Sequence, residues 1–170
     1  MSEQLHHTNS KFQTQQFPIV LICDQVNSPA NIGSLFRIAD SFGIEKIYFC
    51  GEDITVVSKR MLRTARSTHQ YIDHEQVDDI NEVLIKLQKD AYTLLALEIT
   101  AQSIPVSNYE IAANQKIALI IGEENLGVSE DILRMVTQEV HVPMYGNNSS
   151  MNVATATGIA LYALSEKLKN

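Results

Sequence analysis

Apolar and polar residues alternate along the chain in blocks that are typical of strands followed by helices. Five short apolar runs, bounded by polar or turn residues, have the length of buried strands. These runs are residues 18–23 (PIVLIC), 46–51 (KIYFCG), 91–99 (AYTLLALEI), 116–122 (KIALIIG) and 139–144 (EVHVPM). Residues 68–77 are ambiguous and fit at most a short strand.

Between these runs, apolar residues recur three and four positions apart, which predicts helices. The predicted helices are residues 31–43, 57–67, 78–90, 129–136 and 151–169. Strands that are apolar on both faces and alternate with helices indicate a parallel sheet in an α/β fold. We therefore expect one α/β domain over residues 17–170. The polar residues 1–16 are expected to form a flexible N-terminal arm.

The last predicted helix is apolar around most of its circumference. One stripe consists of Val153, Ala156, Ala160, Ala163 and Leu164, and the apolar residues outside it are Ile159, Leu161 and Tyr162. A helix that is apolar on more than one side must be covered on more than one side. A central position in the core and contact with a second copy of the chain both satisfy this pattern.

The chain is acidic overall, but its charged residues are unevenly distributed. The 170 residues carry a net charge of −7, which by itself argues against a nucleic-acid partner. Four of the 13 Lys and Arg residues nevertheless fall in one window: Lys59, Arg60, Arg63 and Arg66. On a helix, Lys59, Arg63 and Arg66 would share a face that suits an RNA backbone, although a solvated face is the alternative.

Other features limit the compartment and the cofactor class. No apolar run is long enough for a membrane helix, and the N-terminus lacks the apolar core of a signal peptide, so we expect a cytoplasmic protein. Cys23 and Cys50 lie in apolar runs and are interpreted as buried thiols. Their spacing, and that of the histidines, indicates no metal site.

Two glycine-containing loops follow predicted strands, at the edge where open α/β sheets bind ligands. Residues 122–127 (GEENLG) have the glycine spacing of a phosphate loop, but Val128-Ser129 stands where such a loop requires Lys-Ser/Thr. Residues 143–152 (PMYGNNSSMN) precede a helix and should present backbone N–H groups. No GxGxxG motif occurs, which disfavours a generic dinucleotide-binding domain. The two loops together could cradle a polar cofactor.

Three segments together resemble the motifs of the SpoU (TrmH-like) family of RNA ribose 2′-O-methyltransferases, within the SPOUT superfamily. They are NIGSLFRIADSFG, IGEENLGVS and VPMYGNNSSMNVATA, in the family's order. The matched positions are Asn31, Gly33 and Arg37, then Gly122, Glu124 and Gly127, then Ser150, Met151, Asn152 and Val153. Met151 replaces the usual Leu, and residues 63–71 depart from the family pattern, which bears on the choice of substrate.

The resemblance implies a fold, a cofactor and partners. The fold would be a parallel α/β sheet with a C-terminal deep trefoil knot, and the cofactor would be S-adenosylmethionine without a metal. The active unit would be a homodimer that packs partly through the last helix. The substrate would be RNA, with tRNA favoured over rRNA because the chain has no room for an accessory rRNA-binding domain. A catalytically silent RNA-binding dimer is the alternative of a different class.

Arg37 is the leading catalytic candidate that the resemblance implies. It lies off the apolar stripe of its predicted helix, and a guanidinium can stabilise an alkoxide as it develops on a ribose. The alternative is a surface Arg that pairs with Asp40 or Ser41.

The remaining catalytic candidates come from all three motifs. Glu124 would orient Arg37 or a substrate hydroxyl, Asn31 and Asn152 would combine helix capping with site building, and Ser150 would bond the substrate or the cofactor. His141 is interpreted as structural. The expected cofactor-binding residues are Leu97, Gly122, Val142, Met144, Ser150 and Met151.

Overall fold

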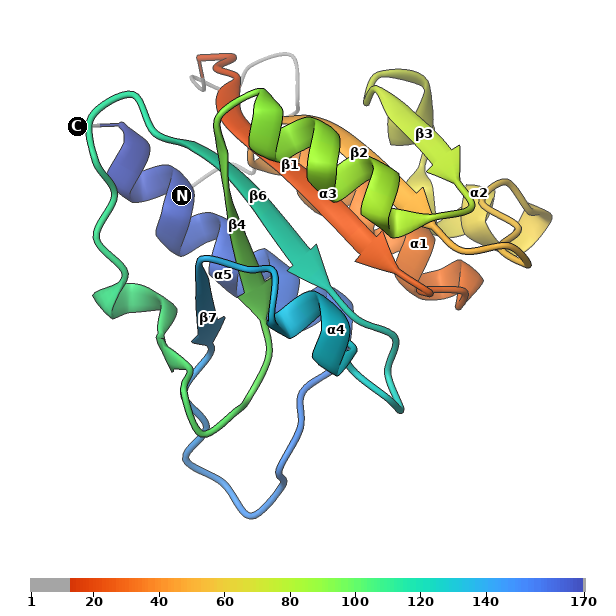
Figure 1. Cartoon of the computed structure of the whole chain (residues 1–170). Coiled ribbons are helices and arrows are strands. Elements are labelled where there is room, and N and C mark those ends of the chain that lie inside the picture. Colours follow the sequence, from red (N-terminus) through yellow and green to blue (C-terminus); the bar gives the residue numbers. More distant parts are fainter. Residues whose placement is uncertain (1–12, 170) are drawn as a thin grey trace, which may run out of the picture.

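Seven parallel strands, with helices on both faces, make up the computed structural model of the chain, which describes residues 13–169 (Figure 1). The strands are β1 (Phe17–Asp24), β2 (Ile44–Cys50), β3 (His74–Val77), β4 (Tyr92–Leu97), β5 (Ile104–Pro105), β6 (Lys116–Ile121) and β7 (Gln138–His141). The α-helices are α1 (Pro29–Ser41), α2 (Lys59–Ala65), α3 (Ile80–Lys89), α4 (Glu130–Leu133) and α5 (Val153–Leu168). The predicted arm lies largely outside the described residues, and residues 13–16 are exposed and irregular.

The order of strands in the sheet is β3-β2-β1-β6-β4-β7-β5, and every pairing is parallel. Side chains of β1 alternate between two cores: Leu21 packs with α1, α2 and α5, and Ile22 packs with α3 and α4. Burial on both faces explains why the strands are continuous apolar runs. The predicted parallel α/β fold is confirmed. Within residues 13–169, no helix is long and apolar enough to cross a membrane.

The structure differs from the prediction at β5 and at α2. The two-residue strand β5 (Ile104–Pro105) was not predicted, because it is too short for an alternating pattern. Helix α2 is shorter than expected: Ser58 caps it by accepting from the Met61 N–H (3.2 Å), and Arg66 ends it in the left-handed conformation with φ 48°. The expectation that Arg66 shares a helix face with Lys59 is therefore wrong.

Helix α5 buries one side and exposes another. Its buried residues are Ala154, Thr157, Ala160, Leu161, Leu164 and Ser165. Leu161, expected outside the buried stripe, is fully buried within its own chain, whereas Ile159 and Tyr162 are 40% and 56% exposed. The Tyr162 ring lies near Phe42 of the segment after α1, with ring centroids 6.3 Å apart. Core packing therefore accounts for one side of the helix only.

Strand β7 lies between β4 and β5, although β5 follows β4 directly in the chain. The chain enters β7 from α4 on one face of the sheet and leaves it toward α5 on the other face (Figure 1). The segment between β5 and β6 is tied to α5, because Lys167 Nζ donates to the carbonyl oxygens of Ser107 (2.6 Å) and Tyr109 (2.5 Å).

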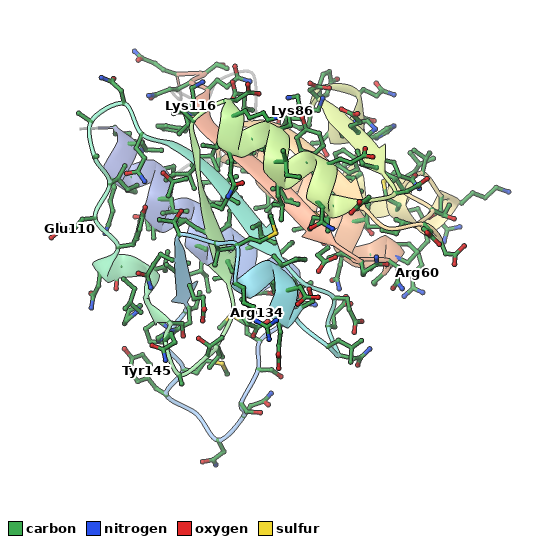
Figure 2. All side chains as sticks on the ribbon, viewed as in Figure 1. Arg60, Lys86, Glu110, Lys116, Arg134 and Tyr145 are labelled. Atoms are coloured by element: carbon green, nitrogen blue, oxygen red, sulfur yellow. The ribbon has the colours of Figure 1, made fainter. Side chains whose placement is uncertain are left out.

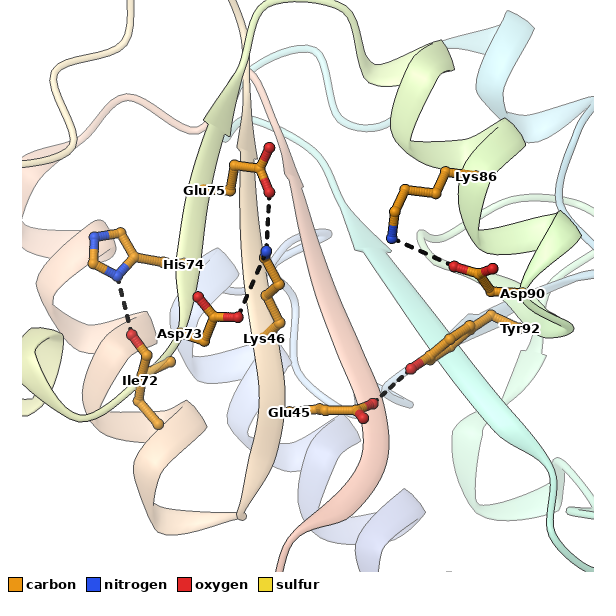
Figure 3. Close-up of polar contacts among 9 residues, drawn as sticks. All are labelled: Glu45, Lys46, Ile72, Asp73, His74, Glu75, Lys86, Asp90 and Tyr92. Carbon is orange, nitrogen blue, oxygen red and sulfur yellow. Dashed lines mark hydrogen bonds and ion pairs between the residues drawn. The ribbon is translucent and has the colours of Figure 1, made fainter.

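Polar contacts at the amino ends of the strands hold neighbouring elements together (Figure 3). Lys46 on β2 pairs with Asp73 (3.5 Å) and Glu75 (2.9 Å). The Tyr92 hydroxyl donates to Glu45 Oε2 (2.6 Å), and burial, followed by this hydrogen bond, raises the pKa of Tyr92. These contacts stabilise the fold at the amino ends of the strands. The loops at the opposite, carboxyl ends do not take part in them.

Both cysteine thiols are buried, as expected. Burial is also the largest cause of the raised pKa of Cys50, about 12, so this thiol stays protonated at neutral pH.

The close approach of α1 and α2 requires a glycine at position 33. A Cβ at Gly33 would lie 2.7 Å from the Met61 carbonyl oxygen and 2.7 Å from Thr64 Cβ. We expect Gly33→Ala to lower the free energy of unfolding by about 1–2 kcal/mol, because overpacking typically costs about 1–3 kcal/mol and outweighs the helix propensity gained. Urea unfolding measures the change.

Gly158→Ala on α5 is the matched control. A Cβ there would lie 3.7–3.9 Å from Ile38, which is ordinary contact. This variant should be unchanged or up to about 1 kcal/mol more stable. Equal stability of the two variants would contradict the packing argument.

Candidate active site

The carboxyl ends of β4, β6 and β7 meet at one edge of the sheet (Figure 1). Their loops surround a cavity of about 510 Å³. The loop after β6 and the loop between β7 and α5 supply most of its wall. All six residues expected to bind the cofactor line this cavity: Leu97, Gly122, Val142, Met144, Ser150 and Met151. The position of the strand ends thus brings together residues from three distant parts of the chain.

The wall of this first cavity combines apolar side chains with a group of carboxylates. Glu98, Glu123 and Glu124 line it, so the cavity has a negative side. His141 also lines it, and its Nδ1 hydrogen-bonds to Ser103 Oγ (2.9 Å). Such a cavity suits a ligand that has both an apolar ring and a positive charge. Among residues 13–169, no cluster of three or more His, Cys, Asp or Glu side chains could hold a metal ion.

Glu98 holds the loop after β6 in place, and sequence reasoning missed it. Its carboxylate accepts hydrogen bonds from the backbone N–H groups of Val128 (3.0 Å) and Ile99 (2.8 Å). The contact leaves no room for a side chain at Gly127, which has φ +67° and whose Cβ would lie 2.3 Å from Glu98 Oε2. In the sequence, the only indication of this role is that a carboxylate stands at the end of an apolar strand. The fold is needed to show that this carboxylate contacts the backbone of the loop after β6.

Gly122 is required by the same loop. A Cβ at this position would lie 2.1 Å from the Gly127 carbonyl carbon and 2.4 Å from the Val128 nitrogen. The loop therefore folds back onto the end of β6, and its backbone forms part of the cavity wall.

A chain of hydrogen bonds joins the three sequence motifs. Asn31 Nδ2 on α1 donates to Glu124 Oε1, and Asn152 Nδ2 donates to Asn31 Oδ1 (3.1 Å). Asn152 also caps α5, because its Oδ1 accepts from the Thr155 N–H (3.1 Å). The expected capping by Asn152 is confirmed. Asn31 is not a cap, since Ser28 holds that position in α1 and Asn31 lies within the first turn.

Arg37 lies on α1 beside a second cavity of about 430 Å³, which Asn152 also lines. Arg37 is exposed, and no ion pair to Asp40 is found among the described residues. Ser41 Oγ donates instead to the backbone carbonyl of Arg37 (2.8 Å). The carboxylate of Glu124 bonds Asn31 and not Arg37, so the expected Glu124–Arg37 contact is absent from the described structure. The guanidinium is thus available to a ligand.

The basic window lies apart from both cavities. Lys59, Arg60 and Arg63 are exposed on α2, Arg66 is exposed at its end, and none forms an ion pair within residues 13–169. Figure 2 shows Arg60 at the side of the molecule formed by α1 and α2. Because α2 packs on α1, the helix that carries Arg37, a polyanion could reach from one to the other.

Comparison with known proteins gives one matching family. The model described as "SpoU rRNA Methylase family" matches residues 18–162. A tRNA (guanosine(18)-2′-O)-methyltransferase from Aquifex aeolicus is 24% identical over 95% of this chain and 75% of its own length. The 23S rRNA (guanosine(2553)-2′-O)-methyltransferase RlmP from Bacillus subtilis is 28% identical over 85% of this chain, which spans only 57% of that relative.

A solved structure shares the fold. The crystal structure of an AdoMet-bound rRNA methyltransferase from Sinorhizobium meliloti superposes with a TM-score of 0.80 and 26% identity. The match covers 92% of this chain and 59% of that chain. This chain therefore corresponds to part of that longer protein.

Proposed function

The chain belongs to the SpoU rRNA Methylase family, and on this basis we propose that it transfers the methyl group of S-adenosylmethionine to a ribose 2′-hydroxyl of RNA. The observation that carries the proposal is the hydrogen-bond chain from Glu124 through Asn31 to Asn152. It joins side chains that are 93 and 121 residues apart in sequence at the boundary of the two cavities.

The first cavity fits S-adenosylmethionine. Leu97, Val142 and Met151 would hold the adenosine against apolar surface, while backbone groups of the loops read its polar edges. The carboxylates of Glu98 and Glu124 suit the positive charges of the sulfonium and the ammonium group. When bound, the cofactor supplies a methyl group activated by its sulfonium centre.

Arg37 would act on the ribose oxygen from the second cavity. A guanidinium stays protonated at neutral pH, so it serves as an electrostatic stabiliser rather than a base. It would stabilise the negative charge that develops on the 2′-oxygen as the proton leaves to water or to a substrate phosphate. Ser150 lines the first cavity and would bond the substrate or the cofactor. Asn31 and Asn152 would fix the distance between the two cavities.

We propose a tRNA substrate, the class for which the Aquifex aeolicus relative is named, with rRNA as the alternative. The names of the relatives include both substrates. A silent RNA-binding dimer is disfavoured because the candidate residues of all three motifs gather at the two cavities.

RNA from a strain that lacks this chain, incubated with the protein and cofactor, should gain a 2′-O-methylnucleoside detectable by mass spectrometry. No gain in any RNA would contradict the proposal.

We infer that the C-terminal part of the chain forms a trefoil knot. Strands β4 and β6 pair with one another, and together with the segment between them they close a loop. In the proposed knot, the chain would pass through this loop on its way from α4 to α5; the place of β7 between β4 and β5 supports this path. We also place the protein in the cytoplasm, where its RNA substrates would be.

Arg37→Ala should lower the single-turnover rate about a hundredfold or more, the scale of losing one preorganised electrostatic group. Arg37→Lys should restore little, because a point charge cannot reproduce a planar fork. Cofactor affinity, measured by titration calorimetry, should be unchanged in both variants. Arg134→Ala, at the exposed end of α4, is the matched control. A normal rate for Arg37→Ala at saturating RNA would reduce Arg37 to a binding residue.

The basic window would contact the RNA backbone. Reversing the charge in Arg63→Glu and Arg66→Glu should weaken RNA binding and reduce the log–log salt slope by roughly 0.7 to 0.9 per lost phosphate contact. Lys86→Glu on α3, the opposite face of the sheet, should leave the slope unchanged. If the slope is unaltered in the α2 variants, Arg63 and Arg66 do not contact the RNA backbone and are ordinary solvated residues.

The active unit would be a homodimer that packs through the exposed side of α5. On that side, Ile159 and Tyr162 are exposed, and the Tyr162 ring lies beside Phe42. Tyr162→Glu should shift the sedimentation mass to that of a monomer, while Ile85→Glu on α3 should not. A monomer mass for the wild type at micromolar concentration would refute the proposed dimer.

A further inference from the structure

The loop between β7 and α5 carries a large side chain that neither the fold nor the two cavities use. Tyr145 is 96% exposed, although its neighbour Met144 lines the first cavity. On its other side, a Cβ on Gly146 would meet no atom within 4 Å. Tyr145 does not itself line the cavity; it points outward from the loop that walls it, at the carboxyl end of the sheet (Figure 2).

Exposed apolar surface gathers around this cavity. Tyr145 and Leu126 (87%) are the two most exposed large apolar residues among those described, and they belong to the two loops that wall the first cavity. Ile99, also exposed, lines the same cavity from the end of β4. An exposed ring contributes no burial to the stability of the fold, so its position at this rim points to a ligand.

The charge at the rim limits what that ligand can be. Glu98, Glu123 and Glu124 line the same cavity, so this side of the site repels phosphate. The basic residues that could hold an RNA backbone lie on α1 and α2. The rim of this cavity therefore offers apolar contact and not phosphate binding.

We propose, resting on the proposed function, that Tyr145 stacks on an unpaired nucleobase of the RNA substrate. A ribose whose 2′-hydroxyl reaches the cofactor has its base outside the first cavity, over the rim. Aromatic side chains stack on unpaired bases, whereas bases within a duplex are covered by their neighbours. The chain would then select a nucleotide in a loop or single strand.

The absence of tryptophan from the sequence gives a direct test of the contact. Tyr145→Trp places a single tryptophan at the rim, and its fluorescence reports stacking. A short single-stranded oligoribonucleotide should quench the emission, while the same strand annealed to its complement and inorganic polyphosphate should not. Equal quenching by polyphosphate, or no quenching by the single strand, would overturn the proposal.

Kinetics separate a stacking residue from a structural one. Tyr145→Ala should raise KM for RNA about tenfold, at the lower end of the effect expected for one base–aromatic stack, with kcat and cofactor affinity near the wild-type values. Tyr145→Phe should keep the wild-type KM, and Ile85→Ala on α3 controls for the loss of an exposed apolar side chain. An unchanged KM in Tyr145→Ala overturns the stacking role. Failure of the wild type to methylate any RNA refutes the proposed function instead, and the fluorescence test still applies.

Discussion

The amide of Asn31 joins the parts of the structure on which the candidate site depends. Its nitrogen donates to Glu124 and its oxygen accepts from Asn152, so both polar atoms of the amide form hydrogen bonds. Aspartate at this position would place a second carboxylate against Glu124 and would lose the donor. The two contacts fix the start of α1, the loop after β6 and the start of α5 relative to one another. They also set the boundary between the two cavities, one for a cofactor and one beside Arg37.

The loop after β6 adds a second constraint. Glu98 bonds its backbone at Val128, and the close approaches at Gly122 and Gly127 exclude side chains there. A loop held in this way presents backbone groups to a ligand in a fixed arrangement, which lowers the entropy lost on binding. The neighbouring loop between β7 and α5 is held at its end by Asn152 and projects Tyr145 outward. One wall of the cavity is therefore fixed by internal contacts, and the other carries an exposed ring.

The sequence pattern was sufficient for the sheet and for most helices, because strands buried on both faces are continuous apolar runs. It could not show β5, whose two residues pair only because β7 lies beside them. It also misplaced Leu161, since periodicity reports that a helix side is apolar but not which neighbour covers it. The residues expected to bind the cofactor were chosen from the motifs and the strand ends, and the fold brings them to one cavity. Glu98 was missed because its importance comes from a contact with Val128, 30 residues later in the chain.

We propose that the cavity at the carboxyl ends of β4, β6 and β7 holds the methyl donor, and that the hydrogen bonds of Asn31 to Glu124 and Asn152 fix the loops around it. Titration of the ¹⁵N-labelled protein with S-adenosylhomocysteine, the demethylated product, tests this most directly. The expected amide shifts lie in residues 97–99, 122–128 and 141–151 and include the side-chain amides of Asn31 and Asn152. Shifts confined to the amino ends of the strands, around Tyr92 and Lys116, would contradict the claim, as would no shift at saturating ligand.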